Sequence, residues 1–385
     1  PQQSKLCLQM TAEMWYNHLM KTYSTAPQKE KALLVVVLTK KGESKNRKID
    51  EITRLASSTD LEVEGVFSQT IKEFNRATVI GSGKVEEICE FLKQHPVDVV
   101  IVDYKLVSSQ IKNLTDAFGT RVIDRVGLIL DIFAKGAKTN EAKLQVKLAQ
   151  NLYNLPRLAQ LKGTSGRYGG GGVGMRGPGE TKLELDRRLL EKEIDVLKKQ
   201  IAKIKEQRNV NRREREKNAI KRVAIVGYTN AGKSSLLNVL TRDDIYVKDK
   251  YFATLDTTSR KLYLDGETVM ITDTVGFISE LPHELVDAFA STLEEARDAH
   301  LILHVVDPTA TSLTEDKEKY YIESMRVTNK VLDDIGATDN RIVVYNKCDL
   351  LSQRFELLPN EIFVSTKTKE GIEDLKKMIK QNLFN

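Results

Sequence analysis

Apolar and polar residues alternate with two different periods in the first third of the chain. Short apolar runs, which predict buried strands, lie at 32–38, 63–67, 78–80 and 97–103. Between them, residues 46–58 carry apolar side chains at helical spacing, and residues 81–94 read as a glycine turn followed by a second helix. This alternation predicts a small α/β domain with a parallel sheet over residues 29–126. Residues 1–28 show no clear period, and we interpret them as an unplaced lead-in.

Two long helical patterns follow, separated by a glycine-rich segment. Residues 127–160 place leucines on one face, and the second helix repeats apolar residues in 4-3-4-3 steps, which is typical of a two-heptad coiled-coil seam. The segment between them, residues 163–179, holds 9 of the 22 glycines. Residues 127–220 are therefore predicted to form an antiparallel helical hairpin with this segment at its tip. The expected seam residues are Leu144, Leu148, Leu152 and Leu155 on the first helix, and Leu190, Ile194, Leu197, Ile201 and Ile204 on the second.

A short apolar run at 223–226 leads into a glycine-containing loop and then into an apolar-periodic helix. The pattern Gly-x-x-x-x-Gly-Lys-Ser in this context predicts a phosphate-binding loop. Its glycines let backbone N–H groups converge on phosphates, its lysine neutralises the β- and γ-phosphates, and its serine hydroxyl ligates Mg²⁺. We assign the neutralising role, which is catalytic, to Lys233 and the metal-ligand role to Ser234. The predicted nucleotide-binding residues are Gly227, Tyr228, Thr229, Asn230, Ala231, Gly232, Lys233, Ser234 and Ser235.

Three further motifs follow at the intervals expected of a guanine-nucleotide-binding domain over residues 221–385. One strand-like run ends in Asp-Thr-Val-Gly, whose aspartate can hold Mg²⁺ through water and whose glycine N–H can sense the γ-phosphate. A later run ends in Asn-Lys-Cys-Asp, whose last carboxylate can accept hydrogen bonds from two guanine donors that adenine lacks. A Ser-Thr-Lys loop resembles the loop that backs the guanine base. The residues are Asp273, Thr274, Val275 and Gly276; Asn346, Lys347, Cys348 and Asp349; and Ser365, Thr366 and Lys367.

A mobile switch is expected between the phosphate loop and Asp273, with a threonine that ligates Mg²⁺ in the GTP state. Thr254, Thr257 and Thr258 are the candidates, and spacing alone does not choose among them. Phe277 stands where Ras-like GTPases carry a glutamine that orients the attacking water. Because an aromatic ring cannot orient water, we predict slow intrinsic GTP hydrolysis, accelerated by a partner or by reorganised switches.

Charge is distributed unevenly along the 385 residues. The net charge is +6, and residues 181–222 alone carry 15 Lys or Arg against 8 Asp or Glu. The basic excess therefore lies in one segment, which indicates either a local contact with a polyanion or a solvated helix. The glycine segment beside it is either a flexible linker or a loop that reaches RNA, and we favour the second. The candidate RNA-binding residues are Arg167, Tyr168, Met175 and Arg176.

Several classes of protein are excluded by what the chain lacks. The three cysteines are far apart, so a disulfide framework and a cysteine-based zinc site are excluded and a reducing compartment is indicated. The longest unbroken apolar run is only seven residues, so we expect no membrane span. No secretory signal is visible near the start, and we expect a cytoplasmic protein.

The segment Gly81-Ser82-Gly83-Lys84 is a weaker signal. It resembles half a phosphate loop but lacks the first glycine. We interpret it mainly as a tight turn from strand to helix, with a second nucleotide site or an RNA phosphate site as the alternative. The five histidines show no metal-ligand spacing, and we interpret His300 and His304 as packing residues.

From about residue 32 to 385 the chain resembles the HflX family of translational GTPases, within the Obg-HflX superfamily. The glycine run that continues into GPGETKLELDRR is the most distinctive match. The matching segments are IGSGKVEEI (80–88), VIDRVGLILDIFA (122–134), KLQVKLAQNLYNLPRL (143–158), GGGGVGMRGPGETKLELDRR (169–188), GYTNAGKSSLLNVL (227–240), FATLD (252–256) and DTVGFI (273–278).

The resemblance implies a GTPase that binds the large (50S) ribosomal subunit and splits stalled or idle ribosomes into subunits under stress. It implies that the glycine loop reaches rRNA near the peptidyl-transferase centre, that GTP/GDP and Mg²⁺ are the ligands, and that ATP binds the N-terminal region of some members. The FATLD match favours Thr254 as the Mg²⁺-ligating residue, and with Lys233 and Gly276 it completes the expected catalytic set. The segment also brings Phe252, Ala253, Leu255 and Asp256 to the nucleotide. We expect a monomer.

Two other functions stay open on the sequence alone. One is a large-subunit assembly or anti-association factor that binds free subunits without splitting ribosomes. The other is an ATP-dependent rRNA-remodelling enzyme that uses Gly83 and Lys84 as part of a second site. We also expect any C-terminal extension of the kind found in relatives to be absent or minimal.

Overall fold

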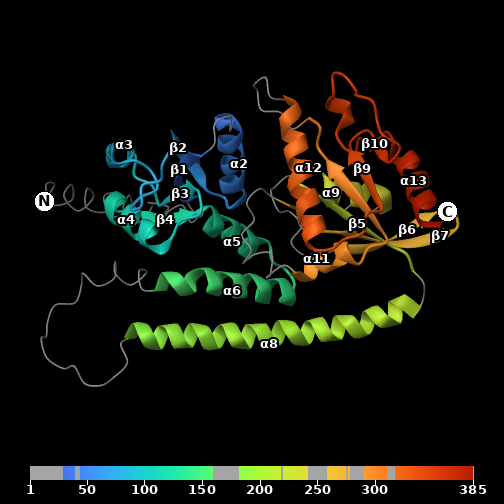
Figure 1. Ribbon diagram of the computed structural model, residues 1–385, viewed down its shortest axis with the longest axis horizontal. Coiled ribbons are helices and arrows are strands. Elements are labelled where there is room, and N and C mark those ends of the chain that lie inside the picture. The colour runs from blue at the N-terminus through green and yellow to red at the C-terminus, as the bar shows by residue number, and fades with distance from the viewer. Residues whose placement is uncertain are drawn as a thin grey trace, which may run out of the picture.

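The computed structural model describes residues 29–39, 44–158, 182–217, 220–241, 258–274, 276–277, 290–309 and 317–384. Figure 1 shows two α/β domains side by side, with the long helix α8 (Lys182–Lys217) running beneath both. The predicted α/β class, with a sheet of mostly parallel strands in the C-terminal domain, is confirmed. None of the helices in the described part of the chain combines the length and the apolar character needed to cross a bilayer.

The N-terminal domain is built on a four-stranded parallel sheet with the order β2-β1-β3-β4. The central strand β1 buries every residue from Ala32 to Leu38 because helices cover both faces of the sheet. Alternate residues of β1 face α2 and α5 on one side and α3 and α4 on the other. The elements are β1 (Lys31–Leu38), α2 (Lys45–Ser58), β2 (Glu62–Thr70), α3 (Ser82–Gln94), β3 (Val99–Asp103), α4 (Ser108–Phe118), β4 (Arg121–Asp124) and α5 (Arg125–Gly136).

The apolar run at 78–80 does not form the predicted strand. Val79 makes only an isolated bridge with Asn75 and adopts a left-handed backbone conformation, with φ of 66°. Its N–H donates to the Asn75 carbonyl at 2.8 Å, which closes a tight turn. The run is apolar because Val79 and Ile80 are buried beneath the helices of this face, not because they pair with a neighbouring strand. The turn-to-helix interpretation of Gly81 to Lys84 is confirmed, since α3 begins at Ser82 and Lys84 pairs with Glu87.

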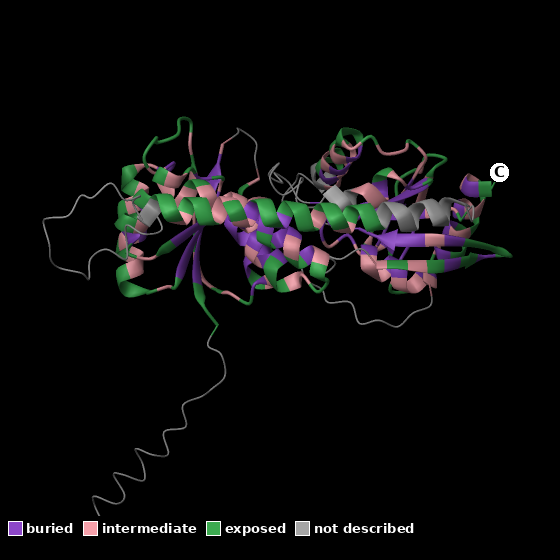
Figure 2. Ribbon diagram, turned by 90° about the horizontal axis from the view of Figure 1, so that it is seen from below, coloured by how far each residue is buried: buried purple, intermediate pink, exposed green. Residues whose placement is uncertain are grey.

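The predicted hairpin seam is confirmed except for Ile204, which does not belong to its packed cluster. Helix α6 (Asn140–Asn154) continues into the short 3-10 helix η1 (Leu155–Arg157) and packs along α8. An ion pair of 2.6 Å between Lys147 and Glu193 lies beside the seam. Figure 2 shows the opposite face of α8 exposed over much of its length. The packed residues are Leu144, Leu148, Leu152, Leu155, Leu190, Ile194, Leu197 and Ile201.

Helix α5 and the start of α6 also belong to the N-terminal core. Residues of both helices pack with β1 in a single apolar cluster, which includes Ile129, Phe133 and Val146. The hairpin is therefore attached to the N-terminal domain by continuous packing.

The C-terminal domain has a six-stranded sheet with the order β10-β9-β8-β5-β7-β6. All its strand pairs are parallel except the hairpin β6–β7, which turns at Asp265-Gly266, a residue pair typical of tight hairpin turns. Helices α9 and α13 pack on one face, and α11 and α12 lie on the other. The elements are β5 (Arg222–Gly227), α9 (Lys233–Thr241), β6 (Thr258–Leu264), β7 (Glu267–Asp273), α11 (Ala290–Arg297), β8 (Leu301–Val306), α12 (Lys317–Asp334), β9 (Arg341–Tyr345), η3 (Cys348–Leu350), β10 (Glu361–Phe363) and α13 (Ile372–Phe384).

Candidate functional site

The loop that follows β5 packs closely against Asn346 at Gly232 and leads directly into helix α9. Gly232 has φ of 92°, and a Cβ added there would lie 2.1 Å from the Nδ2 atom of Asn346, so a larger residue would collide. The Gly232 carbonyl accepts from the Leu236 N–H at 2.9 Å, which starts α9. The loop therefore ends at a helix N-terminus whose backbone N–H groups and positive dipole end are suited to an anion.

Lys233 is buried within this loop, with 7% of its surface exposed. Its Nζ donates to the Tyr228 carbonyl at 2.8 Å. Burial lowers the pKa of Lys233 to about 8, and the nearby Asp273 carboxylate opposes that shift. The lysine therefore stays mostly charged at neutral pH, and a bound phosphate group would stabilise that charge further.

Ser234 and Asp273 bring two oxygen atoms together beside the loop. The Ser234 hydroxyl donates to the Asp273 Oδ2 atom at 2.6 Å, and Asp273 is 1% exposed at the end of β7. Within the described residues, no three His, Cys, Asp or Glu side chains form a metal-binding group. A hydroxyl and one carboxylate, completed by phosphate oxygens and water, fit Mg²⁺, which keeps several waters and few protein ligands.

Gly276 and Phe277 lie directly against the phosphate loop. A Cβ at Gly276 would lie 2.9 Å from the Nζ atom of Lys233 and 3.0 Å from the Cα atom of Thr229, so a larger residue would push against the phosphate loop. The Thr229 N–H donates to the Phe277 carbonyl at 2.8 Å, and the Phe277 N–H donates to the Gly227 carbonyl at 3.1 Å. Phe277 is 2% exposed and packs in an apolar cluster with Val226 and Leu332. Its ring therefore points into the core and offers nothing to orient a water molecule.

The second half of the site is the loop after β9. Asn346 is fully buried, donates from Nδ2 to the Ala231 carbonyl at 2.9 Å, and accepts from the Thr366 N–H at 3.2 Å. Its amide therefore ties the phosphate loop to the 365–367 loop. The exposed Asp349 carboxylate accepts from the Ser365 hydroxyl at 2.7 Å, which orients it for a base.

The neighbours of Asp349 take different positions. Lys347 adopts a left-handed conformation and donates from Nζ to the Asn230 carbonyl at 3.1 Å and to the Asp307 carboxylate at 2.6 Å. The Cys348 thiol faces the protein, near Arg354 and Glu370, and burial raises its pKa. The Cys348 side chain therefore stabilises the loop by packing and does not face the nucleotide site.

The remaining predicted residues divide into three groups. Thr274 is fully buried and donates from its hydroxyl to the Ile225 carbonyl at 2.8 Å, so it holds the end of β7 against β5. Ser235 lies in the first turn of α9, and Lys367 is exposed on the loop beside Asp349. Other residues lie outside the described part of the chain: Phe252, Ala253, Thr254, Leu255, Asp256, Val275, Arg167, Tyr168, Met175 and Arg176.

His304 lies within the sheet behind the site. It is 2% exposed on β8, and burial, together with the nearby Arg341 and Lys233 cations, lowers its pKa to about 3. The imidazole is therefore neutral. His300 accepts the Arg222 N–H at its Nδ1 atom, 3.1 Å away. Both histidines support the fold, as the sequence interpretation states.

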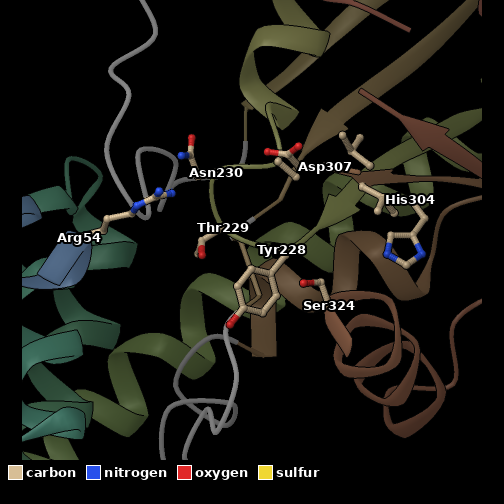
Figure 3. A pocket seen from close by; sticks show the side chains of 10 residues that line it. Arg54, Tyr228, Thr229, Asn230, His304, Asp307 and Ser324 are labelled. Carbon is tan, nitrogen blue, oxygen red and sulfur yellow. The ribbon is translucent and has the colours of Figure 1, made fainter. Parts of the chain in front are cut away.

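Two groups of site residues were missed by the sequence reasoning. Asp307 directly follows β8, and its pairing with Lys347 could have been anticipated because adjacent parallel strands end at one edge of the sheet. The second group comes from the N-terminal domain. A small pocket beside the phosphate loop is lined by Arg54, Asn230 and Asp307 among others, and Figure 3 shows Arg54 reaching toward Asn230 from α2. No local pattern signals that Arg54 lines this pocket.

A phosphate-binding loop and a guanine-type specificity loop at one edge of a six-stranded sheet define the class of this domain, which is that of the P-loop GTPases. Family models agree. The N-terminal region of GTP-binding GTPases matches residues 46–134, their middle region matches 136–215, and the 50S ribosome-binding GTPase model matches 222–347.

Individual relatives identify the family. The GTPase HflX of Caldanaerobacter subterraneus subsp. tengcongensis is 47% identical over 378 residues, which cover 97% of this chain and 84% of that protein. The GTPase HflX of Escherichia coli is 40% identical over 345 residues, which cover 87% of this chain and 79% of that protein. A solved complex described as SsGBP and GDP is 25% identical, covers 92% of this chain and 98% of its own, and has a TM-score of 0.51. The chain belongs to the HflX family of GTPases, which confirms the resemblance.

Proposed function

We propose that the protein uses GTP binding and hydrolysis to split stalled or idle ribosomes into subunits under stress, through a contact of its hairpin with the large subunit. The observation that carries the proposal is the connection between hairpin and nucleotide site. Helix α8 ends at Lys217 and β5, which leads into the phosphate loop, begins at Arg222. The family model for ribosome-binding GTPases supports the ribosome as partner.

At the nucleotide site, each residue has a chemical role in this proposal. Lys233 neutralises the β- and γ-phosphates, Gly276 donates its N–H to the γ-phosphate, and Asp349 selects guanine. Ser234 and Thr254 would hold Mg²⁺ directly and Asp273 through water, and the ion would neutralise charge on the phosphate oxygens. Water attacks the γ-phosphorus, the bond to the β-phosphate oxygen breaks, and GDP and phosphate leave. Phe277 supplies no water-orienting group, so hydrolysis is slow until the large subunit is bound.

The hairpin supplies the contact with RNA. Its basic helix and its glycine-rich tip, with Arg167, Tyr168, Met175 and Arg176, are suited to rRNA near the peptidyl-transferase centre because guanidinium groups pair with phosphates and aromatic rings stack on bases. The GTP-bound protein places this tip on the 50S subunit, and GDP-bound protein leaves it. The protein acts as a monomer in the cytoplasm, where assembled ribosomes are found.

A sedimentation experiment tests the proposal. Intact ribosomes are mixed with the protein and GTP, GDP or a non-hydrolysable GTP analogue, and the mixture is separated on a sucrose gradient. We expect free subunits to increase with GTP and with the analogue but not with GDP. If the protein binds isolated large subunits yet leaves intact ribosomes assembled with every nucleotide, the splitting function is refuted and an anti-association factor is favoured.

The role of the hairpin tip is tested by deleting residues 166–176. We expect the deletion to retain GTP affinity within about twofold, because the nucleotide site is formed by other segments, and to lose stimulation of GTP turnover by purified large subunits. Full stimulation in the deleted protein would show that the segment is only a linker.

A further inference from the structure

Tyr228 is a phosphate-loop residue whose side chain lies in the other domain. Its ring is 4% exposed and belongs to the apolar cluster formed by β1, α2, α5 and α6 of the N-terminal domain. Its hydroxyl donates to the Oε1 atom of Glu51 on α2 at 3.1 Å. A residue of the nucleotide site therefore contacts the core of the domain that carries the hairpin.

The acceptor of this hydrogen bond is itself held by a buried ion pair. Glu51 is 5% exposed and pairs with Arg125 at the start of α5, and the other amino group of Arg125 donates to the Asp103 Oδ1 atom at 2.6 Å. Although burial alone would lower the pKa of Arg125, the Glu51 and Asp103 carboxylates raise it well above its usual value. The cation is therefore permanent, and the carboxylate of Glu51 has one preferred position for the tyrosine hydroxyl.

The backbone of Tyr228 reaches the groups that handle phosphate. Its carbonyl accepts from the Lys233 Nζ at 2.8 Å, and the next N–H, that of Thr229, donates to the Phe277 carbonyl, one residue after Gly276. Tyr228 also forms a parallel bridge with Phe277. A displacement of Tyr228 must therefore move the lysine and the γ-phosphate-sensing backbone together.

We propose that Glu51 and Arg125 of the N-terminal domain are positioning residues of the GTPase site, and that they act through Tyr228 on Lys233 and on the Gly276–Phe277 backbone. Binding of phosphate to Lys233 withdraws the donor from the Tyr228 carbonyl, and the resulting shift of Tyr228 is transmitted to α2. By the reciprocity of linked equilibria, docking of the N-terminal domain changes GTP affinity by the same factor by which GTP changes docking. The inference rests on GTP binding at this site and requires no ribosome.

The principal test is Tyr228→Phe in the full chain, which keeps the ring in its apolar cluster and removes only the hydroxyl. Two properties are measured without ribosomes: KM and kcat of GTP turnover, and hydrogen exchange of residues 45–58 with GDP and with a non-hydrolysable GTP analogue. We expect wild-type exchange in α2 to differ between the nucleotides. We expect Tyr228→Phe to change KM about fivefold and to abolish most of the difference in exchange between the nucleotides. A change of about fivefold in affinity is at the lower end of the range typical of coupling between two sites.

Tyr153→Phe is the matched control. Tyr153 also donates its hydroxyl to a buried carboxylate, Asp124, at 2.7 Å, but within the N-terminal half of the molecule. We expect this variant to keep the wild-type KM and the nucleotide-dependent exchange, even if its thermal midpoint falls. Equal effects of the two substitutions would reduce Tyr228 to a general structural role and overturn the proposal.

A second pair of variants separates hydrogen bonding from folding. Glu51→Gln retains an acceptor for the tyrosine hydroxyl, whereas Glu51→Ala removes it, so we expect glutamine to preserve KM better than alanine. Adding Tyr228→Phe to Glu51→Ala should change KM little further, because both substitutions remove the same hydrogen bond. Wild-type kinetics and exchange in Tyr228→Phe, or α2 exchange that ignores the nucleotide in the wild type, would refute the inference. A wild-type protein that fails to bind GTP would instead refute the proposed function.

Discussion

The two sheets of this protein place carboxylates at equivalent edges but neutralise them differently. In the N-terminal domain, Asp103 ends β3 and pairs with Arg125, and Asp124 ends β4 and lies 3.4 Å from Arg157. Both carboxylates are almost fully buried. Arginine holds carboxylates with a rigid planar fork and never loses its charge, so these two carboxylates are neutralised without a ligand.

In the C-terminal domain, the side chains at the carboxyl ends of the strands have partners that a ligand could replace. Asp273 accepts from the Ser234 hydroxyl, and Asp307 pairs with Lys347. Lys233 donates to a backbone carbonyl and has a lowered pKa. The Lys233 ammonium, whose partner is a neutral carbonyl, and the Ser234 hydroxyl can turn to a phosphate or a metal ion at less cost than a buried arginine pair can. The two sheets thus differ in the groups that face the carboxylates at this edge: arginines in the N-terminal sheet, and a serine hydroxyl and a lysine in the C-terminal sheet.

The largest expected effect comes from breaking the internal pair of the N-terminal domain. Arg125→Met should lower the free energy of unfolding of that domain by about 3–5 kcal/mol, because it leaves the carboxylates of Glu51 and Asp103 buried without their cation. Urea unfolding monitored by circular dichroism measures this change. Arg354→Met is the control, since Arg354 pairs with Glu370 at a half-exposed position and its loss should cost less than about 1 kcal/mol. Equal losses would contradict the comparison.

Lys233→Ala tests whether this lysine in the C-terminal domain serves ligand binding and not stability. We expect GTP and GDP affinity to fall at least about tenfold, as for the loss of a charged hydrogen bond, with no loss of stability in the nucleotide-free protein. Burial of Lys233 disfavours its charge, so removing it relieves a cost. Titration with a fluorescent GDP analogue measures the affinity, and the thermal midpoint without nucleotide measures stability. A large fall in that midpoint would show that Lys233 is structural, like Arg125.

Asp349→Asn tests base recognition at the same edge. The substitution replaces an acceptor pair with one acceptor and one donor, so the preference for GTP over ATP should fall about tenfold or more. Competition of unlabelled GTP and ATP against fluorescent GDP measures the ratio. The Ser365 hydroxyl orients the Asp349 carboxylate, so Ser365→Ala should shift the ratio in the same direction and by less. An unchanged ratio in Asp349→Asn would remove this residue from base recognition.

The pH dependence of GTP affinity should show the smallest effect. Burial lowers the pKa of Lys233 to about 8 without nucleotide, and bound phosphate favours the charged lysine, so binding takes up a proton. Affinity is therefore complete well below pH 8 and is lost as pH rises through that value, with a fall of about fourfold between pH 7 and pH 8.5. In Lys233→Ala this fall should be absent. A wild-type affinity that rises over this range would contradict the assigned direction.

Much of the fold and the site could be predicted from local pattern. The hairpin seam was predictable because residues such as Leu148 and Ile194 repeat with the coiled-coil period, and the phosphate loop because glycine spacing, strand and helix coincide. The run at 78–80 misled because burial against helices requires the same residues as strand pairing. The contact between Glu51 and Tyr228 spans 177 positions and joins one charged residue on a helix to one loop tyrosine. No sequence pattern around either residue predicts it.

The continuity of α8 has a mechanical consequence. Its 36 residues extend about 54 Å at 1.5 Å per residue, and the seam with α6, from Leu190 to Ile201, attaches part of that length to the N-terminal domain. The other end stops five residues before the first residue of β5. A tilt of about 10° at that end would carry the far end through about 9 Å. In the function proposed above, the helix would serve as a lever arm that enlarges small adjustments around the nucleotide.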